Sequence, residues 1–259
     1  MPPDDDLARD LAAEAGRRLL SLRAAGGDPD GMRKAGDRLS HEFLIAELAR
    51  ERPGDVVLSE EGRDDPARLA AERVWIVDPL DGTREFGEPG RPDWAVHVAL
   101  WAQGRLAAGA VALPARGCVL TTAEPGRRSA GVSPAAGGHA EDTVQPLRVM
   151  VSRTRAPAFA TRLAGDMGAT LLPLGSAGAK AAAVICGEAD AYVHDGGQYE
   201  WDSAAPVAVA LAAGMHASRL DGSKLEYNQA NPWLPDLVMC PVPLADALLK
   251  AIDTARRTG

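Results

Sequence analysis

The stretch Val74-Trp75-Ile76-Val77-Asp78-Pro79-Leu80-Asp81-Gly82-Thr83-Arg84-Glu85-Phe86 decides how this chain of 259 residues is organised. Its first four residues are apolar and mostly β-branched, which predicts a buried strand. Pro79 keeps the preceding residue out of the helical region, so Asp78 should lie at the end of that strand. The chain then turns, and Thr83 is placed to begin a helix.

The turn carries two carboxylates three residues apart, with the Leu80 carbonyl between them. Hard cations such as Mg²⁺ prefer oxygen ligands of this kind, and free N–H groups at the beginning of a helix attract phosphate. An ordinary acidic turn is the alternative, because Asp, Pro and Gly are all common in turns. The decision between the two depends on the rest of the chain.

The composition is that of a globular protein, with 46% hydrophobic and 25% charged residues. A formal net charge of −8 argues against a nucleic-acid-binding surface. Cys118, Cys186 and Cys240 lack metal-site spacing and fit reduced core residues. The acidic start has no apolar signal segment, and the longest apolar run, Ala204–Met215, is too short to cross a bilayer. We therefore expect a cytoplasmic protein without membrane or nucleic-acid partners; a homodimer stays open.

The order of the expected elements divides the chain into two halves. The first half reads as helices followed by strands, and the second alternates strands with helices, which is typical of an α/β arrangement. Glu124–Pro146 is rich in Gly, Pro, Ser and Ala and is interpreted as a mobile connection. We accordingly predict an N-terminal α+β metal-site domain over 1–146 and a C-terminal α/β substrate domain over 147–259.

Several expected elements position acidic residues. A helix predicted over Asp37–Arg50 has Asp37 at its N-cap, and a short strand over Val56–Leu58 ends in Ser59-Glu60-Glu61. Asp202 comes just before the apolar helix predicted over Ala204–Ala213. It either caps that helix or supplies a further metal ligand from the second half.

Together these residues carry a resemblance. Asp37, Glu60-Glu61, Asp78–Thr83 and Trp201-Asp202 follow the order and approximate spacing of the lithium-sensitive, Mg²⁺-dependent phosphatase superfamily. That superfamily includes inositol monophosphatases, fructose-1,6-bisphosphatases and 3'-phosphoadenosine 5'-phosphate (PAP) phosphatases. Three stretches look most like its CysQ group of 3'(2'),5'-bisphosphate nucleotidases: Ser59-Glu60-Glu61, Thr83-Arg84-Glu85-Phe86 and Leu225-Glu226-Tyr227-Asn228.

The resemblance implies a layered α-β-α-β-α sandwich of the inositol monophosphatase and fructose-1,6-bisphosphatase type, with the site between the halves. It implies two or three Mg²⁺ ions held by Glu60, Asp78, the Leu80 carbonyl, Asp81 and Asp202. The implied catalytic residues are Asp37, Thr83 and Glu60. The substrate-binding residues that we predict are Leu80, Asp81, Gly82, Thr83, Arg84, Gly175, Ser176, Asp202 and Tyr227.

Two departures from the family pattern concern Asp37 and Lys180. The chain reads Ala35-Gly36-Asp37 where the family often has Thr-Ala-Asp, and Lys180 is displaced by one position from the expected lysine. The five histidines are scattered and are interpreted as structural or surface residues: His41, His97, His139, His194 and His216.

The predicted function is hydrolysis of the 3'-phosphate of PAP, and of PAPS, by metal-activated water in sulfur assimilation. The enzymatic alternative is an inositol monophosphatase or a broad sugar phosphatase. The non-enzymatic alternative is a scaffold whose acids only staple two halves through cations. Thr83 beside the acids argues against the scaffold, because a staple needs no hydroxyl there.

Overall fold

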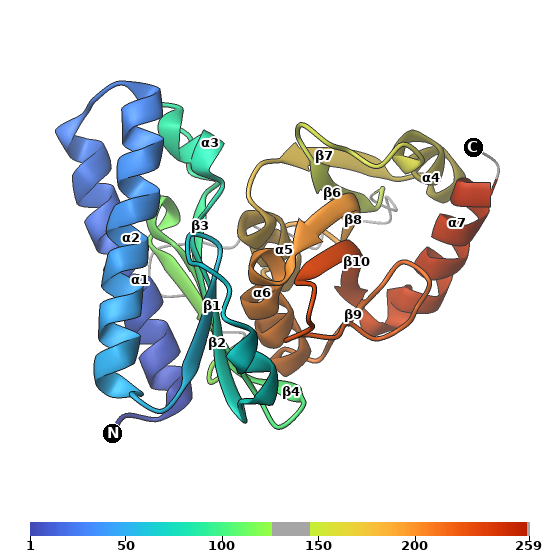
Figure 1. Ribbon diagram of the computed structural model, residues 1–259. Coiled ribbons are helices and arrows are strands. Elements are labelled where there is room, and N and C mark those ends of the chain that lie inside the picture. The colour runs from blue at the N-terminus through green and yellow to red at the C-terminus, as the bar shows by residue number, and fades with distance from the viewer. Residues whose placement is uncertain (126–145, 258–259) are drawn as a thin grey trace.

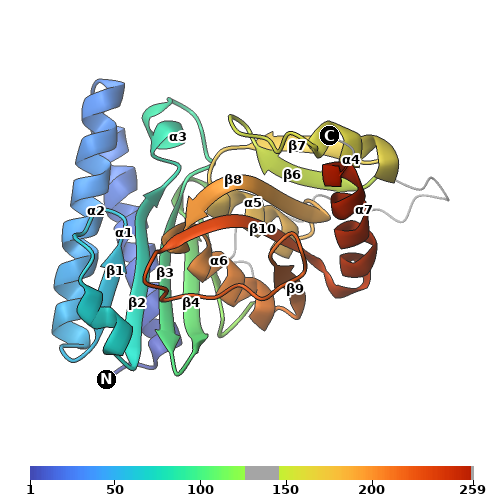
Figure 2. The same cartoon turned by 45° about the vertical axis from the view of Figure 1, so that its right-hand side comes forward.

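The computed structural model describes residues 1–125 and 146–257. It has five layers, with helices on both outer sides and two helices between two sheets (Figures 1 and 2). This is the layered α-β-α-β-α sandwich predicted above, and that prediction is confirmed. Most of the expected connection over Glu124–Pro146 lies outside the described residues.

The first sheet has the order β1-β2-β3-β4-β5. β1 pairs in parallel with β2, and the remaining neighbours are antiparallel, so β2 to β5 form a meander. The strands are β1 (Val56–Ser59), β2 (Arg73–Asp81), β3 (Ala95–Ala102), β4 (Arg105–Leu113) and β5 (Cys118–Thr121).

The second sheet has the order β7-β6-β8-β10-β9 and comes entirely from the second half of the chain. β6 is parallel to β7 and β8, whereas β10 is antiparallel to β8 and β9. The strands are β6 (Arg148–Ser152), β7 (Thr170–Leu174), β8 (Ala191–Tyr199), β9 (Met215–Ser218) and β10 (Trp233–Pro241).

The helices fill the layers between and outside the sheets. α1 (Asp4–Ala25) and α2 (Pro29–Glu51) cover one face of the first sheet, and α5 (Ala177–Ile185) and α6 (Glu200–Ala212) lie between the sheets (Figure 2). Outside the second sheet lie α4 (Ala160–Met167) and α7 (Ala245–Arg257) (Figure 1). The short α3 (Thr83–Gly87) follows β2 directly.

The two halves share a core. One buried cluster joins Leu58 and Ile76 of the first sheet to α5, α6 and residues of the second sheet such as Tyr192 and Leu237. Removing these apolar side chains from water favours contact between the halves as well as within each half. The first sheet comes from residues before 146 and the second from residues after it. The division into a metal-site domain and a substrate domain stays a prediction.

Two helix boundaries correct the sequence interpretation. α2 begins at Pro29, with Asp28 as its N-cap and the Asp28 side chain accepting from Gly31 N at 2.8 Å, so Asp37 lies inside the helix and not at its cap. α6 begins at Glu200, which places Asp202 in the first turn. Asp37 and Asp202 both resemble residues that begin a helix, so the earlier start of each helix was not predicted. Pro at the first position of α2 and acids in the first turn of α6 also favour the beginning of a helix. Within residues 1–125 and 146–257, no helix is long and apolar enough to span a membrane.

Candidate active site

The site is built on the end of β2. The pairing of β2 with β3 shifts register between Asp78 and Asp81, and the Asp78 side chain accepts a hydrogen bond from Leu80 N at 3.0 Å. Gly82 has φ 84°, a left-handed conformation that costs glycine little. These features end the strand and let α3 begin at Thr83.

Three carboxylates converge at this point. Asp78 and Asp81 of β2 and Asp202 of α6 each have a carboxylate oxygen within 4.8 Å of the others. Asp202 is held by the first turn of its helix, since its side chain accepts from Tyr199 N at 2.6 Å. The structure thus brings together acids that are far apart in the sequence and come from both halves.

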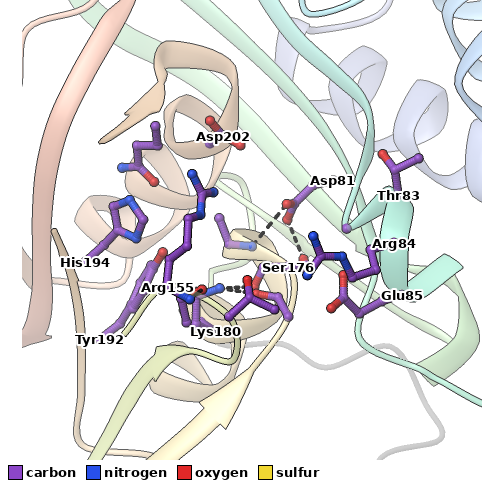
Figure 3. Close-up of a pocket in the computed structure, with 16 residues that line it drawn as sticks. Asp81, Thr83, Arg84, Glu85, Arg155, Ser176, Lys180, Tyr192, His194 and Asp202 are labelled. Atoms are coloured by element: carbon purple, nitrogen blue, oxygen red, sulfur yellow. Dashed lines mark hydrogen bonds between the residues drawn. The ribbon is translucent and has the colours of Figure 1, made fainter. Parts of the chain in front are cut away.

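Asp81 is anchored to the beginning of α5. Its carboxylate accepts hydrogen bonds from the Ser176 hydroxyl and from Ala177 N at 3.1 Å (Figure 3). It also accepts one from Gly178 N at 2.7 Å. His97 Nε2 lies 3.3 Å from Asp81 Oδ2, close enough for an ion pair although it does not form a well-aligned hydrogen bond. Burial alone would raise the pKa of Asp81, but the neighbouring His97, the charge of Lys180 and the hydrogen bond from Ser176 outweigh burial and lower the pKa to about 2.

His97 is fully buried in β3 and belongs to the site. Its Nδ1 lies 3.1 Å from the Trp201 carbonyl and 4.0 Å from Asp78 Oδ2, so it contacts elements that carry all three acids. A Cβ at Gly178 would lie 2.2 Å from His97 Nε2, so only glycine at that position lets the ring reach Asp81. Burial lowers the pKa of His97, but the Asp81 carboxylate outweighs this and raises it.

The other acids lack this compensation. Burial and the charges of Glu60 and Asp81 raise the pKa of Asp78 well above its usual value, and Asp78 Oδ2 is buried without a hydrogen-bond partner among the described residues. Glu60 remains exposed as a residue, yet partial burial of its carboxylate and the charge of Asp202 raise its pKa to about 7. Burial and the charge of Asp81 raise the pKa of Asp202 to about 6. Buried acids that repel one another and an unpaired carboxylate oxygen fit a bound cation.

Asp37 and Thr83 lie beside each other next to this cluster. The Thr83 hydroxyl is 3.3 Å from Asp37 Oδ1 and 2.9 Å from the Leu80 carbonyl, so one hydroxyl proton faces two acceptors. Burial, followed by the charge of Glu61, raises the pKa of Asp37 to about 6. The carbonyl that we predicted as a metal ligand is therefore in contact with the threonine in this structure.

A cavity of about 490 Å³ opens from these acids towards the second half of the chain. Its lining includes Asp81, Gly82, Thr83, Arg84, Gly175, Ser176 and Asp202, with Ser176 close to Asp81 and Arg84 (Figure 3). The volume is within the range of small-molecule sites, about 300–1,000 Å³. These seven predicted substrate-binding residues meet in one place.

Tyr227 does not line the cavity. It is buried in the core, and its hydroxyl lies 3.1 Å from Ser203 Oγ. The second half contributes Tyr192 and His194 of β8 instead, together with Gln198, Arg155 and Lys180 (Figure 3). His97 and His194 were interpreted from the sequence as structural or surface residues, and their place at the site was missed. Both lie within strands, β3 and β8, that contribute to the site.

Two arginines at the cavity stand out by their lack of acidic partners. Arg153 pairs with Glu85 and Glu88, and Arg91 pairs with Asp93. Arg84 and Arg155, in contrast, form no ion pair with the described residues, and both are exposed to the cavity. Lys180 is buried, donates to the Gly175 and Ser176 carbonyls, and has its pKa lowered by burial to about 8.

Comparison with known proteins identifies the family of this arrangement. Residues 7–253 match the inositol monophosphatase family, with the carboxylate cluster and the cavity inside the matched region. The chain belongs to the inositol monophosphatase family. Enzymes of this family use divalent metal ions, and the carboxylates of Asp78, Asp81 and Asp202 form a group that could hold one.

Within the family, bisphosphate nucleotidases are among the similar proteins. The chain is 53% identical to the 3'-phosphoadenosine 5'-phosphate phosphatase of Mycobacterium tuberculosis, over 94% of this chain and 91% of that protein. It is 32% identical to the 3'(2'),5'-bisphosphate nucleotidase CysQ of Salmonella typhimurium, over 86% and 94%. The crystal structure of CysQ from Bacteroides thetaiotaomicron superposes with a TM-score of 0.73 at 26% identity, covering 90% of this chain and 95% of that one.

Proposed function

We propose that this protein is a Mg²⁺-dependent phosphatase that hydrolyses the 3'-phosphate of PAP, yielding AMP and inorganic phosphate. The names of its relatives support this substrate, and the cavity supports it independently. A role in sulfur assimilation and action on PAPS remain predictions from the resemblance. A cytoplasmic location remains a prediction from the sequence, and a homodimer stays open.

The observation that carries the proposal is that one cavity offers two places for an anion. The carboxylate cluster with its cations would hold the phosphate to be cleaved, and the unpaired guanidinium groups of Arg84 and Arg155 offer a second place. Arginine binds phosphate through charge-assisted, often bidentate hydrogen bonds. PAP carries two phosphates, whereas inositol 1-phosphate carries one.

The metal ions would be held by Asp78, Asp81 and Asp202, with Glu60 completing the set. When bound, two ions supply charge neutralisation of the phosphate and a lowered pKa of the attacking water. The buried Asp78 oxygen without a partner and the raised pKa values of Glu60 and Asp202 support this assignment. Asp81 is deprotonated already, because His97 and the beginning of α5 stabilise its charge.

Asp37 and Thr83 would receive a proton from the attacking water. The Thr83 hydroxyl donates to Asp37 or to the Leu80 carbonyl, which leaves an oxygen lone pair of Thr83 free to orient the water. A base is most effective when its pKa lies near the working pH, and the pKa of Asp37 is raised to about 6. As the bond from phosphorus to the 3'-oxygen breaks, a new bond to the water oxygen forms. The 3'-oxygen takes up a proton from a solvent water, so AMP leaves with a 3'-hydroxyl, and the proton received by Asp37 returns to solvent.

The far wall of the cavity would bind the nucleotide. His194 Nδ1 and Gln198 Nε2 are buried there without hydrogen-bond partners among the described residues. His194 Nε2 lies 3.0 Å from the Gly197 carbonyl and therefore carries the proton, so Nδ1 is free to accept a hydrogen bond while Gln198 donates. A base edge with one donor and one acceptor satisfies both.

Phosphate release from a panel of substrates tests the reaction. We expect activity on PAP only when Mg²⁺ is present, with a kcat/KM at least about tenfold above that for inositol 1-phosphate, equivalent to about 1.4 kcal/mol. Hydrolysis of fructose 1,6-bisphosphate as efficient as that of PAP would indicate a broad sugar phosphatase and not a nucleotidase. Full activity in excess EDTA contradicts the metal mechanism. Equal efficiency on PAP and inositol 1-phosphate contradicts the nucleotide substrate while leaving the phosphatase standing.

The second anion place is tested with Arg155→Gln, assayed on PAP and on 3'-AMP, which lacks the 5'-phosphate. A hydrogen bond to a charged group contributes about 1.5–3 kcal/mol, so kcat/KM for PAP should fall about 10- to 150-fold while that for 3'-AMP changes little. Arg162→Gln, an exposed arginine of α4 outside this cavity, is the matched control. An equal loss on both substrates removes Arg155 from recognition of the second phosphate.

A further inference from the structure

The segment Tyr227–Gln229 touches the site only indirectly, although its first two residues belong to the stretch that resembles the CysQ group. Tyr227 and Asn228 are buried, and neither lines the cavity. Asn228 has φ 61°, a left-handed conformation that asparagine tolerates better than most residues. The backbone of the segment is therefore held in one conformation, and contacts other than those with substrate must explain why Tyr227 and Asn228 are buried.

This segment holds both ends of the turn that carries Asp202. The buried Glu200 carboxylate accepts hydrogen bonds from Asn228 N at 2.7 Å and from Gln229 N at 2.8 Å. Tyr227 Oη lies 3.1 Å from Ser203 Oγ, one residue beyond Asp202. The first turn of α6 is thus fixed on either side of the carboxylate that joins the metal cluster.

The same segment is bound to the first half of the chain through Arg68, whose side chain is 1% exposed. Arg68 Nη1 donates to Asn228 Oδ1 at 2.8 Å, Nη2 donates to the Gln229 carbonyl at 2.8 Å, and Asn228 Nδ2 donates back to the Arg68 carbonyl at 3.2 Å. Arg68 lies in the 3₁₀ helix η1 (Pro66–Ala70). Its guanidinium also binds Asp64 through Nε at 2.6 Å and Nη2 at 3.0 Å.

These contacts fix the position of the loop that carries Glu60. The loop leaves β1 at Ser59, carries Glu60 and Glu61, and is tied down at Asp64 and Arg68. From Arg68 the buried bonds continue to Asn228, to Glu200 and so to the turn that carries Asp202. One polar path therefore connects the loop that carries Glu60 with the helix that carries Asp202.

We propose that Arg68, Asn228 and Glu200 form a clamp between the halves that positions Glu60 relative to Asp202 for metal binding. They are positioning residues and touch neither metal nor substrate. The inference rests on the metal-binding role proposed above for Glu60 and Asp202. The clamp gives the stretch Leu225–Asn228 a role that does not require Tyr227 to contact the nucleotide.

Physical chemistry favours a positioning role over simple stabilisation. Burying an arginine and a glutamate costs desolvation free energy, and apolar residues of similar volume often stabilise a protein as well or better. Directional, satisfied hydrogen bonds instead fix one geometry. A metal site assembled from two halves needs such a geometry, because ligands that are displaced lose affinity, and outer partners of metal ligands commonly contribute about 10- to 100-fold.

Asn228→Gly isolates the clamp most cleanly. Glycine accepts the left-handed backbone and keeps the N–H that binds Glu200, so the substitution removes only the side-chain bonds to Arg68. We expect the Mg²⁺ concentration that produces a given rise in Tm of the substrate-free protein to increase roughly threefold or more. The half-saturating Mg²⁺ for phosphate release should increase in parallel, with kcat at saturating Mg²⁺ largely retained.

Arg68→Lys is the second variant, because lysine keeps the charge but loses the fork that reaches Asp64, Asn228 and Gln229 together. It should raise the half-saturating Mg²⁺ similarly, and the double variant should add little to either single effect. Arg219→Lys, which disrupts a comparable fork to Asp236 within the second half, is the matched control. Ile252→Ala controls for lost stability alone.

The outcomes separate the two levels of the proposal. Wild-type half-saturation by Mg²⁺ in both clamp variants, or an equal shift in the two controls, overturns the clamp. If Mg²⁺ does not raise the Tm of the wild-type protein at all, the metal assignment itself fails. If Arg68→Lys does not fold, Asn228→Gly decides, since it retains the buried arginine and its bonds to Asp64 and Gln229.

Discussion

Asp78 and Asp81 are three residues apart on one turn, yet the structure predicts opposite effects when each is neutralised. Asp81→Asn should destabilise the metal-free protein. The Asp81 carboxylate accepts hydrogen bonds from three groups at the beginning of α5 and faces His97. An amide there turns an N–H₂ group towards donors and removes the negative charge beside the buried Lys180, whose pKa of about 8 keeps it charged near neutral pH.

The size of this effect follows from the contacts that are lost. Removing the partner of a buried charge, here Asp81 beside Lys180, costs about 3–5 kcal/mol. For a protein of about this length, each kcal/mol shifts Tm by roughly 2–4 °C, so Asp81→Asn should lower Tm by roughly 6–20 °C in EDTA near neutral pH.

Asp78→Asn should raise Tm under the same conditions. Asp78 Oδ1 keeps its bond from Leu80 N in the amide, whereas Oδ2 is buried without a partner and is surrounded by acids that raise the pKa of Asp78. An N–H₂ group in that place removes a repelled charge and points donors at the neighbouring carboxylates. Both substitutions should abolish activity, since each removes a metal ligand.

Thermal unfolding by circular dichroism in EDTA, repeated with Mg²⁺, measures both effects. Mg²⁺ should raise the Tm of the wild-type protein but of neither variant. A Tm for Asp81→Asn at or above wild type would refute the anchoring of Asp81 to α5. A fall in Tm for Asp78→Asn similar to that for Asp81→Asn would refute the assignment of Asp78 as an uncompensated acid.

Three further predictions concern protons and roles. The pKa values of Asp37, Glu60 and Asp202 are raised in the metal-free fold to about 6, about 7 and about 6. The free energy of unfolding of the metal-free protein therefore falls as pH rises through these values. For this reason the Mg²⁺-induced rise in Tm should be larger at about pH 7.5 than at about pH 5. An equal rise at both pH values contradicts the charge cluster. Thr83→Ala should lower kcat with little change in half-saturating Mg²⁺, and a wild-type kcat would exclude the hydroxyl from the reaction. Glu60→Gln should raise the half-saturating Mg²⁺ more than Glu61→Gln does, measured by phosphate release; the reverse order would exchange their roles.

Much of the site could be predicted from the sequence because its anchors are local. An apolar strand ending in Asp78-Pro79-Leu80-Asp81-Gly82-Thr83 specifies by itself a strand end, a turn and a helix start. The layered fold and Asp202 came from the order of motifs, and the structure brings Asp202 beside the first two acids. Gly175 and Ser176 likewise face the cavity as expected.

The residues that were missed depend on long-range packing. Nothing local marks His97, which reaches Asp81 only because β3 pairs with β2 and Gly178 leaves room for the ring. Tyr227 was predicted at the nucleotide from a resemblance alone, but packing places its hydroxyl on Ser203 in the core. Arg155 carried no sequence signal either, because an arginine shows whether it is paired only when its neighbours are known.

The charge balance of the site explains why it lies between the halves. Within the first half, Asp78 and Glu60 repel each other, and Asp202 from the second half adds to that repulsion. Asp81 alone is compensated by the second half, through the beginning of α5. In the metal-free protein, the hydrogen bonds from α5 to Asp81 stabilise the interface between the halves, whereas repulsion between Asp202 and the acids of the first half destabilises it. Bound cations neutralise that repulsion. Metal binding and closure of the interface are therefore thermodynamically linked, so that substitutions in the interface should change metal affinity and added metal should stabilise the interface.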